Sequence, residues 1–110
     1  MSDDALLVLT TCGNDEDAKA LAHVLVEQRL AACVNAVGRV ASIYRWKGEV
    51  QQDQETLLII KTTVARFAAL ETAIRANSKY ELPEVVALSL HGGSSDYLTW
   101  LRESVAELKD

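Results

Sequence analysis

Hydrophobic positions along the chain predict strands and helices in the order strand, helix, strand, strand, helix, strand, helix. The run 5–11 is rich in Leu and Val and short enough for a strand buried on both faces. After Gly13 and Asn14, apolar residues recur every three or four positions from Ala18, which predicts an amphipathic helix ending near Arg29. Asn14 can cap this helix, and three acidic residues follow at its positive end.

The stretch 32–61 changes to a pattern typical of extended strands. Its first half is rich in β-branched and aromatic residues, and Gly38 indicates a bulge or bend. Lys47 and Gly48 predict a two-residue hairpin turn, followed by a return strand over 49–61. Both strands are about twice the usual five or six residues, so the hairpin must overhang a small domain. Because unpaired strand edges invite another chain, we expect a homo-oligomer built by strand pairing.

The last third predicts a helix, a strand and a final helix. Thr62 or Thr63 can cap the first of these helices, and Pro83 precedes a strand over 85–90. The predicted apolar faces are Val64, Phe67, Leu70 and Ile74 for the first helix, and Leu98, Leu101, Val105 and Leu108 for the last. We therefore expect an α+β, ferredoxin-like βαββαβ sandwich with a long central hairpin and an extra C-terminal helix. It forms one domain over 1–110, with its strands in the order fourth, first, third, second.

Composition excludes several classes of protein. The chain has 110 residues, 49% of them hydrophobic, and a net charge of −5, so disorder is excluded and no basic surface for nucleic acid is expected. No apolar run approaches the ~20 residues that span a bilayer. The amino terminus is acidic where a secretory signal is basic, and two cysteines make no disulfide framework. We therefore expect a cytoplasmic protein with no membrane association.

Five ordered segments resemble those of the CutA divalent-cation tolerance proteins, from about Leu7 to Leu101. They are AACVN at 31–35, SIYRWKGE at 42–49, LIIKT at 58–62, YELPE at 80–84 and DYLTWL at 96–101. The resemblance implies a homotrimer similar in architecture to PII signalling proteins. It also implies a role in tolerance of copper and other divalent cations, and no enzymatic activity.

The copper ligands suggested for some CutA proteins are a Cys and a His-His pair. The resemblance places them at Thr10, Asn77 and Ser78 here, and none of these is a soft or borderline ligand. We therefore expect this chain to bind copper or another divalent cation more weakly than relatives that carry the Cys and His set.

The remaining candidate metal ligands are Cys12, Glu84 and His91. The predicted topology brings Cys12, Tyr80, Glu81 and Glu84 to one end of the sheet, together with the hairpin tip. His91 lies at the opposite end, so only a partner chain can bring it to Cys12. Cys12 precedes a helix amino terminus, where the pKa of a thiol is expected to fall.

Large aromatic residues indicate where subunits meet. Tyr44 and Trp46 alternate on one face of the hairpin, and Trp100 lies on the last helix. The predicted inter-subunit interface or cleft contains Tyr44, Trp46, Glu55, Lys61, Tyr80, Tyr97 and Trp100.

These features favour a non-enzymatic trimeric binding or scaffold protein linked to divalent-cation homeostasis, acting with an unidentified partner protein. One alternative is a PII-like sensor that binds a small metabolite in clefts between subunits. Another is an acylphosphatase-like hydrolase, but that chemistry needs an arginine in the phosphate loop, and the loop at 11–14 has none.

Overall fold

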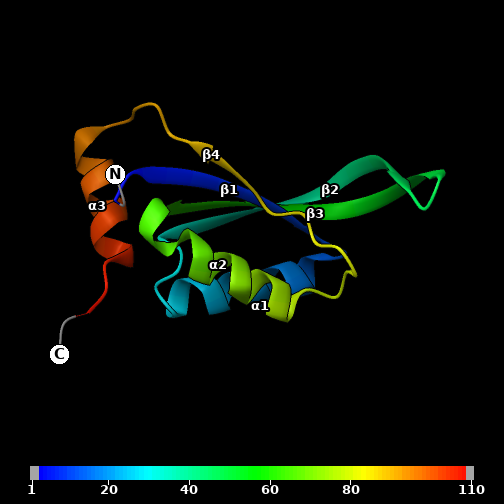
Figure 1. Cartoon of the computed structure of the whole chain (residues 1–110), viewed down its shortest axis with the longest axis horizontal. Helices are drawn as coiled ribbons and strands as arrows, with labels where there is room; N and C mark the ends of the chain where they lie inside the picture. Colours follow the sequence, from blue (N-terminus) through cyan, green and yellow to red (C-terminus); the bar gives the residue numbers. More distant parts are fainter. Residues whose placement is uncertain (1–2, 109–110) are drawn as a thin grey trace.

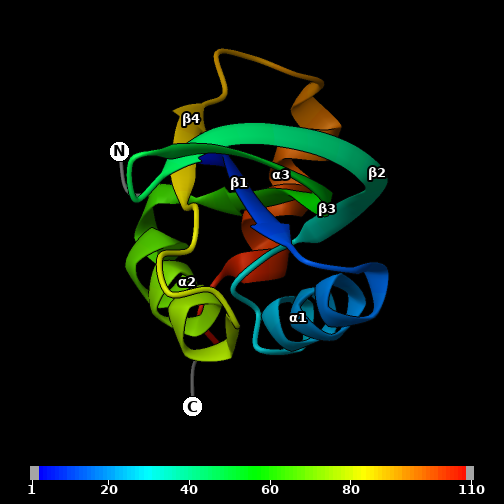
Figure 2. The ribbon, with the colours of Figure 1, turned by 90° about the vertical axis from the view of Figure 1, so that its right-hand side faces the viewer.

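The computed structural model describes residues 3–108 and shows a four-stranded antiparallel sheet with two helices on one face and a third at one end (Figures 1 and 2). The elements are β1 (Ala5–Cys12), α1 (Asp15–Glu27), β2 (Cys33–Trp46), β3 (Glu49–Thr63), α2 (Val64–Asn77), β4 (Val86–Ser89) and α3 (Ser95–Val105). The strands lie in the order β2-β3-β1-β4. The expected fold class and strand order are confirmed.

The hairpin of β2 and β3 is the longest feature of the molecule, and its arm extends past the helices (Figure 1). Its strands contain 14 and 15 residues. Lys47 and Gly48 form the turn with φ of 51° and 83°, and Trp46 pairs with Glu49 across it. Positive φ at both turn residues matches the right-handed twist of the strands, so the two-residue turn is confirmed.

The bulge predicted at Gly38 is present, because the β2–β3 register shifts between Val37 and Val40. The positive φ falls on Arg39, at 60°. The role of Gly38 is instead to let the Asp15 side chain approach the backbone closely. A Cβ built on Gly38 would lie 3.1 Å from Asp15 Oδ1. The start of α1 therefore packs directly against the bulge.

The core lies between the sheet and the two helices α1 and α2. Its buried members include Leu6, Val8, Ala18, Leu21, Leu25, Leu58, Ile60, Leu70 and Ile74. Two residues expected to be buried are exposed instead. Val64 is 44% exposed because it is the first residue of α2, and Leu108 is 75% exposed because α3 ends at Val105.

The opposite face of the sheet is also apolar, and α3 is the one helix of the described residues that packs on it. Side chains alternate along a strand, so the residues between the core positions face away from α1 and α2. They include Leu7, Leu9, Leu57, Ile59, Val86 and Leu88. Leu101 and Val105 of α3 are buried, whereas Val86 and Leu88 on the edge strand β4 are about half exposed. Much of this apolar face therefore has no cover from residues 3–108. Within residues 3–108, no helix is long and apolar enough to cross a membrane.

Candidate functional site

A small pocket of about 100 Å³ lies where β1 ends, α1 begins and the segment after α2 passes by. We call it the Cys12 pocket; its lining is Thr10, Thr11, Cys12, Gly13, Asp17, Leu21, Ile74, Asn77, Ser78, Lys79 and Tyr80. Thr10, Asn77 and Ser78 therefore lie around one space, although they come from β1 and from the end of α2. These are the three positions at which the resemblance places suggested copper ligands.

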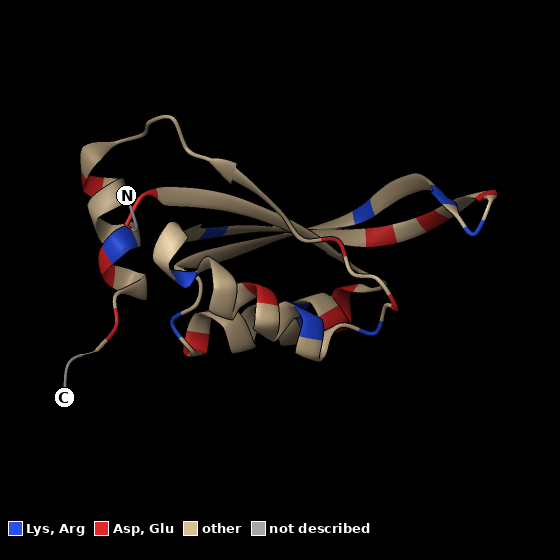
Figure 3. Ribbon diagram, in the orientation of Figure 1, with Lys and Arg blue, Asp and Glu red and all other residues tan. Residues whose placement is uncertain are grey.

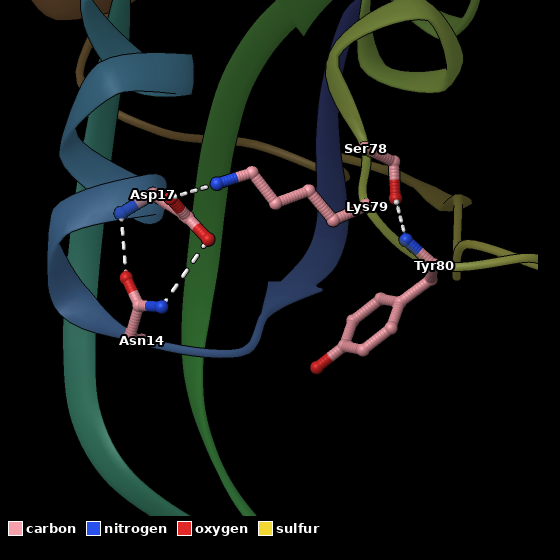
Figure 4. A network of polar contacts seen from close by, with 5 residues as sticks. All are labelled: Asn14, Asp17, Ser78, Lys79 and Tyr80. Carbon is pink, nitrogen blue, oxygen red and sulfur yellow. Dashed lines mark hydrogen bonds and ion pairs between the residues drawn. The ribbon is translucent and has the colours of Figure 1, made fainter.

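Polar contacts tie the segment after α2 to the first turn of α1 (Figure 4). The Asp17 backbone N–H donates to Asn14 Oδ1 at 2.8 Å, which caps the helix as predicted. Lys79 Nζ lies 2.9 Å from Asp17 Oδ1. The hydrogen bond from Lys79 lowers the pKa of Asp17, and the same bond raises the pKa of Lys79. One wall of the pocket thus already carries a paired cation and carboxylate.

Cys12 is a half-buried thiol in this pocket. Burial raises its pKa, and the negative charges of Asp17 and Glu55 raise it further. The lowering expected from the adjacent helix amino terminus is therefore wrong. Three acidic residues fill the first turn of α1 and offset its positive end. Metal ions bind the thiolate, so Cys12 must lose its proton before it can act as a ligand. The environment of Cys12 disfavours this deprotonation.

A larger groove of about 810 Å³ runs between the hairpin arm and the segment 79–84. This hairpin groove is lined by Thr11, Ser42, Ile43, Tyr44, Arg45, Trp46, Glu55, Lys79, Tyr80, Glu81, Leu82, Pro83 and Glu84. The Tyr80 hydroxyl donates to Glu55 Oε2 at 2.6 Å. Burial and this bond to Glu55 raise the pKa of Tyr80 well above its ordinary value. The Tyr44 hydroxyl donates to Asp53, which raises the pKa of Tyr44.

The residues predicted for an inter-subunit interface fall into two groups at opposite ends of the folded molecule. Tyr44, Trp46, Glu55 and Tyr80 line the hairpin groove, together with Glu84. Lys61, Tyr97 and Trp100 meet at the other end: the two rings are 5.3 Å apart, and Lys61 Nζ lies 5.7 Å from the Tyr97 ring. Glu55 and Lys61 are six residues apart on β3, about 20 Å, so they do not line one cleft within a chain.

The candidate metal ligands Cys12, Glu84 and His91 are not assembled within one chain. His91 follows Leu90, whose N–H donates to Ala5 O at the start of β1. Cys12 is at the other end of that strand, about 23 Å away. Among residues 3–108, no three His, Cys, Asp or Glu side chains gather in a group that could hold a metal ion. Residues 3–108 of one chain therefore do not by themselves assemble a ligand set for a divalent cation.

Two participants in the site were missed from the sequence, Asp53 and Lys79. The first was within reach of prediction. A turn at 47–48 places Tyr44 opposite Gln51 and Ser42 opposite Asp53, so Tyr44 and Asp53 are diagonal neighbours on one face. The pairing of Lys79 with Asp17 depends on the path of a loop and joins residues 62 positions apart. No local pattern indicates it.

Comparison with known proteins gives one consistent result. Residues 6–104 match the family of the CutA1 divalent ion tolerance protein. The chain is 50% identical over 98 residues to the divalent-cation tolerance protein CutA of Thermus thermophilus, covering 89% of this chain and 95% of that protein. It is 42% identical over 100 residues to human protein CutA, covering 91% of this chain but only 56% of the human protein. It likewise spans 55% of the chloroplastic CutA of Arabidopsis thaliana, at 46% identity over 100 residues, 91% of this chain.

Solved structures agree with these sequence relatives. The Thermus thermophilus divalent cation tolerance protein superimposes with a TM-score of 0.91 at 48% identity, covering 93% of this chain and 99% of that one. CutA1 from Oryza sativa gives a TM-score of 0.92 at 44% identity, covering 96% of each chain.

Proposed function

This chain belongs to the CutA1 divalent ion tolerance protein family, and we propose that it is a non-enzymatic, homotrimeric binding protein that contributes to tolerance of copper and other divalent cations. Its Thermus thermophilus relative carries divalent-cation tolerance in its name. Under this proposal, residues 1–110 form a single domain that acts in the cytoplasm. Binding of a cation or ligand to this domain is signalled to a partner protein.

The observation that carries the proposal is the open apolar face of the sheet, which adjoins the hairpin groove. Val86 and Leu88 are about half exposed on the edge strand β4. Ile43, 68% exposed, and Val50, 65% exposed, lie on the other face of the hairpin arm, which continues the side of the core positions Leu58 and Ile60. Apolar side chains on open strands at both edges of the sheet support strand pairing between copies of the chain. Three subunits is the number that the CutA resemblance implies.

Association also supplies what one chain lacks for cation binding. Cys12 and Glu84 belong to one end of the molecule and His91 to the other, so a site that uses all three must lie between subunits. Thr10, Asn77 and Ser78 offer oxygen atoms where relatives suggested to bind copper have sulfur and imidazole nitrogen. Oxygen ligands suit hard cations, so copper affinity is lower here than in those relatives.

An acylphosphatase-like activity has no support in the geometry. The loop before α1 has no arginine, and its helix begins with Asp15, Glu16 and Asp17, whose charges repel a phosphate group. Assays with acyl phosphates are expected to show no turnover. Turnover that is lost on substitution of this loop would contradict the non-enzymatic proposal.

The direct test is a calorimetric titration of Cu(II) and of Zn(II) into the reduced protein. Cys12→Ser removes the candidate thiol, and Cys33→Ser is the matched control, because Cys33 pairs with Lys61 at the far end of the sheet. We expect binding that is lost in Cys12→Ser and kept in Cys33→Ser. Absence of binding in the unmodified protein would show that direct capture is wrong and that tolerance is indirect.

A further inference from the structure

The hairpin arm leaves the sheet as a ribbon of two strands. β1 ends at Cys12, which pairs with Thr56, so among the described residues the hairpin positions 40–46 and 49–55 pair only with each other. A two-stranded ribbon twists strongly and is only marginally stable by itself. At the same level, the bulge between Val37 and Val40 bends β2. The direction of the arm therefore depends on the contacts at its base.

Side chains on both faces of β3 hold this base. On the face covered by α1, Thr56 is 2% exposed, and its hydroxyl donates to Asp15 Oδ1 at 2.5 Å. Asp15 also lies against the bulge, because its Oδ1 is 3.1 Å from a Cβ built on Gly38. On the opposite face, Glu55 Oε2 accepts a hydrogen bond from the Tyr80 hydroxyl at 2.6 Å. Two neighbouring residues of one strand are thus bonded to two different elements.

A third contact joins those two elements to each other. Lys79 Nζ lies 2.9 Å from Asp17 Oδ1, so the segment that carries Tyr80 is tied to the first turn of α1 (Figure 4). The strand β3, the helix α1 and the segment after α2 are therefore bonded pairwise. We call this set of contacts the arm clamp; it consists of Thr56–Asp15, Tyr80–Glu55 and Lys79–Asp17.

The charges near the arm oppose this arrangement. Acidic positions lie along the β3 arm and in the segment between α2 and β4 beside it (Figure 3). Like charges repel, so the two segments need a contact that holds them together. At the turn, Lys47 Nζ lies 3.7 Å from Glu81 Oε2, but these side chains are 72% and 73% exposed, so this ion pair contributes little. Among the described residues, the Tyr80–Glu55 bond is therefore the main polar link between the segment and the arm.

We propose that the arm clamp is a positioning device for assembly, which holds the hairpin arm in the direction at which a neighbouring copy of the chain pairs with it. This inference rests on the homotrimer proposed above. A strand edge pairs with another chain only where its donors and acceptors meet those of the partner, so the direction of the arm controls the contact. An arm that is fixed before association also loses less conformational entropy on binding, which slows dissociation.

Subunit exchange measures this role separately from folding. Unlabelled and isotope-labelled protein are mixed, and native mass spectrometry follows the appearance of mixed trimers. Thr56→Val removes the bond to Asp15 at a buried position that a neighbouring copy does not touch. Thr62→Val is the matched control, because Thr62 is also buried on β3 and donates to Leu30 O at 2.7 Å, far from the arm. We expect Thr56→Val to exchange subunits at least about fivefold faster than the unmodified protein, and Thr62→Val to exchange at the unmodified rate.

Asp17→Asn opens the arm clamp at a second point by removing the ion pair with Lys79, and it keeps the test open if Thr56→Val does not fold. Glu71→Gln is its matched control, since it removes an ion pair of 3.8 Å with Arg75 on α2. We expect faster exchange in Asp17→Asn and an unchanged rate in Glu71→Gln. Chemical denaturation of the same variants shows that exchange does not simply follow stability, because Thr62→Val is expected to lose as much stability as Thr56→Val.

The outcomes separate this inference from the homotrimer on which it rests. Light scattering gives the mass of the unmodified protein, and a mass of one chain would overturn the homotrimer and the arm clamp together. A trimer in which neither Thr56→Val nor Asp17→Asn exchanges faster than its control would overturn the arm clamp alone.

Discussion

The Tyr80 hydroxyl donates a 2.6 Å hydrogen bond to Glu55 Oε2, which fastens the segment after α2 to the hairpin arm. Tyr80 lines both the Cys12 pocket and the hairpin groove. Its hydroxyl also lies 3.6 Å from the point where a Cβ on Gly13 would stand. A substitution of Tyr80 therefore alters the lining of both the Cys12 pocket and the hairpin groove.

Tyr80→Phe removes this bond and is expected to lower the free energy of unfolding by about 1 kcal/mol. Chemical denaturation at fixed protein concentration measures the loss. Tyr97→Phe is the matched control, because the Tyr97 hydroxyl has no hydrogen-bond partner within residues 3–108. An equal effect of the two substitutions would contradict a specific role for the Tyr80 bond.

Because the pKa of Tyr80 is raised, we expect the stability of the fold and the titration of its phenols to change at alkaline pH. A group whose pKa is higher in the folded than in the unfolded protein stabilises the fold below its unfolded pKa, which is about 10 for tyrosine. That stabilisation is lost as the pH rises from there toward the folded pKa. Ultraviolet titration of the phenols should therefore show a late phase to which Tyr44 and Tyr80 both contribute, and the amplitude of this phase should fall by one phenol in Tyr80→Phe. A wild-type titration with no such phase would refute the assigned environment.

Cys12 should react slowly with iodoacetamide at neutral pH, because alkylation requires the thiolate and burial with Asp17 and Glu55 raises the thiol pKa. In a Cys33→Ser background, Asp17→Asn removes one of these charges and releases Lys79. The alkylation rate, followed by mass spectrometry, is expected to rise several-fold. Glu16→Gln, which alters a neighbouring exposed charge, should have a smaller effect. A rate unchanged by Asp17→Asn would count against this electrostatic account.

Gly48→Ala tests the hairpin turn. Gly48 has φ of +83° and no atom within 4 Å of a built Cβ, so any cost comes from the backbone conformation alone. We expect a loss of about 1 kcal/mol in the free energy of unfolding. Gly92→Ala is the matched control, since Gly92 also has open space but lies outside the positive-φ region. Equal stability of the two variants would show that the turn geometry is described wrongly.

Local signals in the sequence were enough to predict most of the fold. The turn at Lys47 and Gly48, the bulge at Gly38 and the cap at Asn14 each depend on neighbouring residues. The end of α3 was predicted less well, because Leu108 continues the apolar spacing of a helix that stops at Val105. The spacing of apolar residues does not show where the tertiary contacts that stabilise a helix end.

The chemistry of the site was harder to predict, because it depends on residues distant in the sequence. The helix start before Asp15 suggested a low thiol pKa for Cys12, but burial and the carboxylate of Glu55, 43 positions away, raise it. The Tyr80–Glu55 bond joins residues 25 positions apart through a loop of irregular path. Tertiary packing determines such contacts, and no local sequence pattern predicts them.

We propose that copies of this chain associate through the open sheet face and strand edges to complete the binding sites. Light scattering coupled to gel filtration at micromolar concentration measures the mass of the assembly. We expect a mass three times that of the 12.0 kDa chain. A stable particle with the mass of one chain would contradict it.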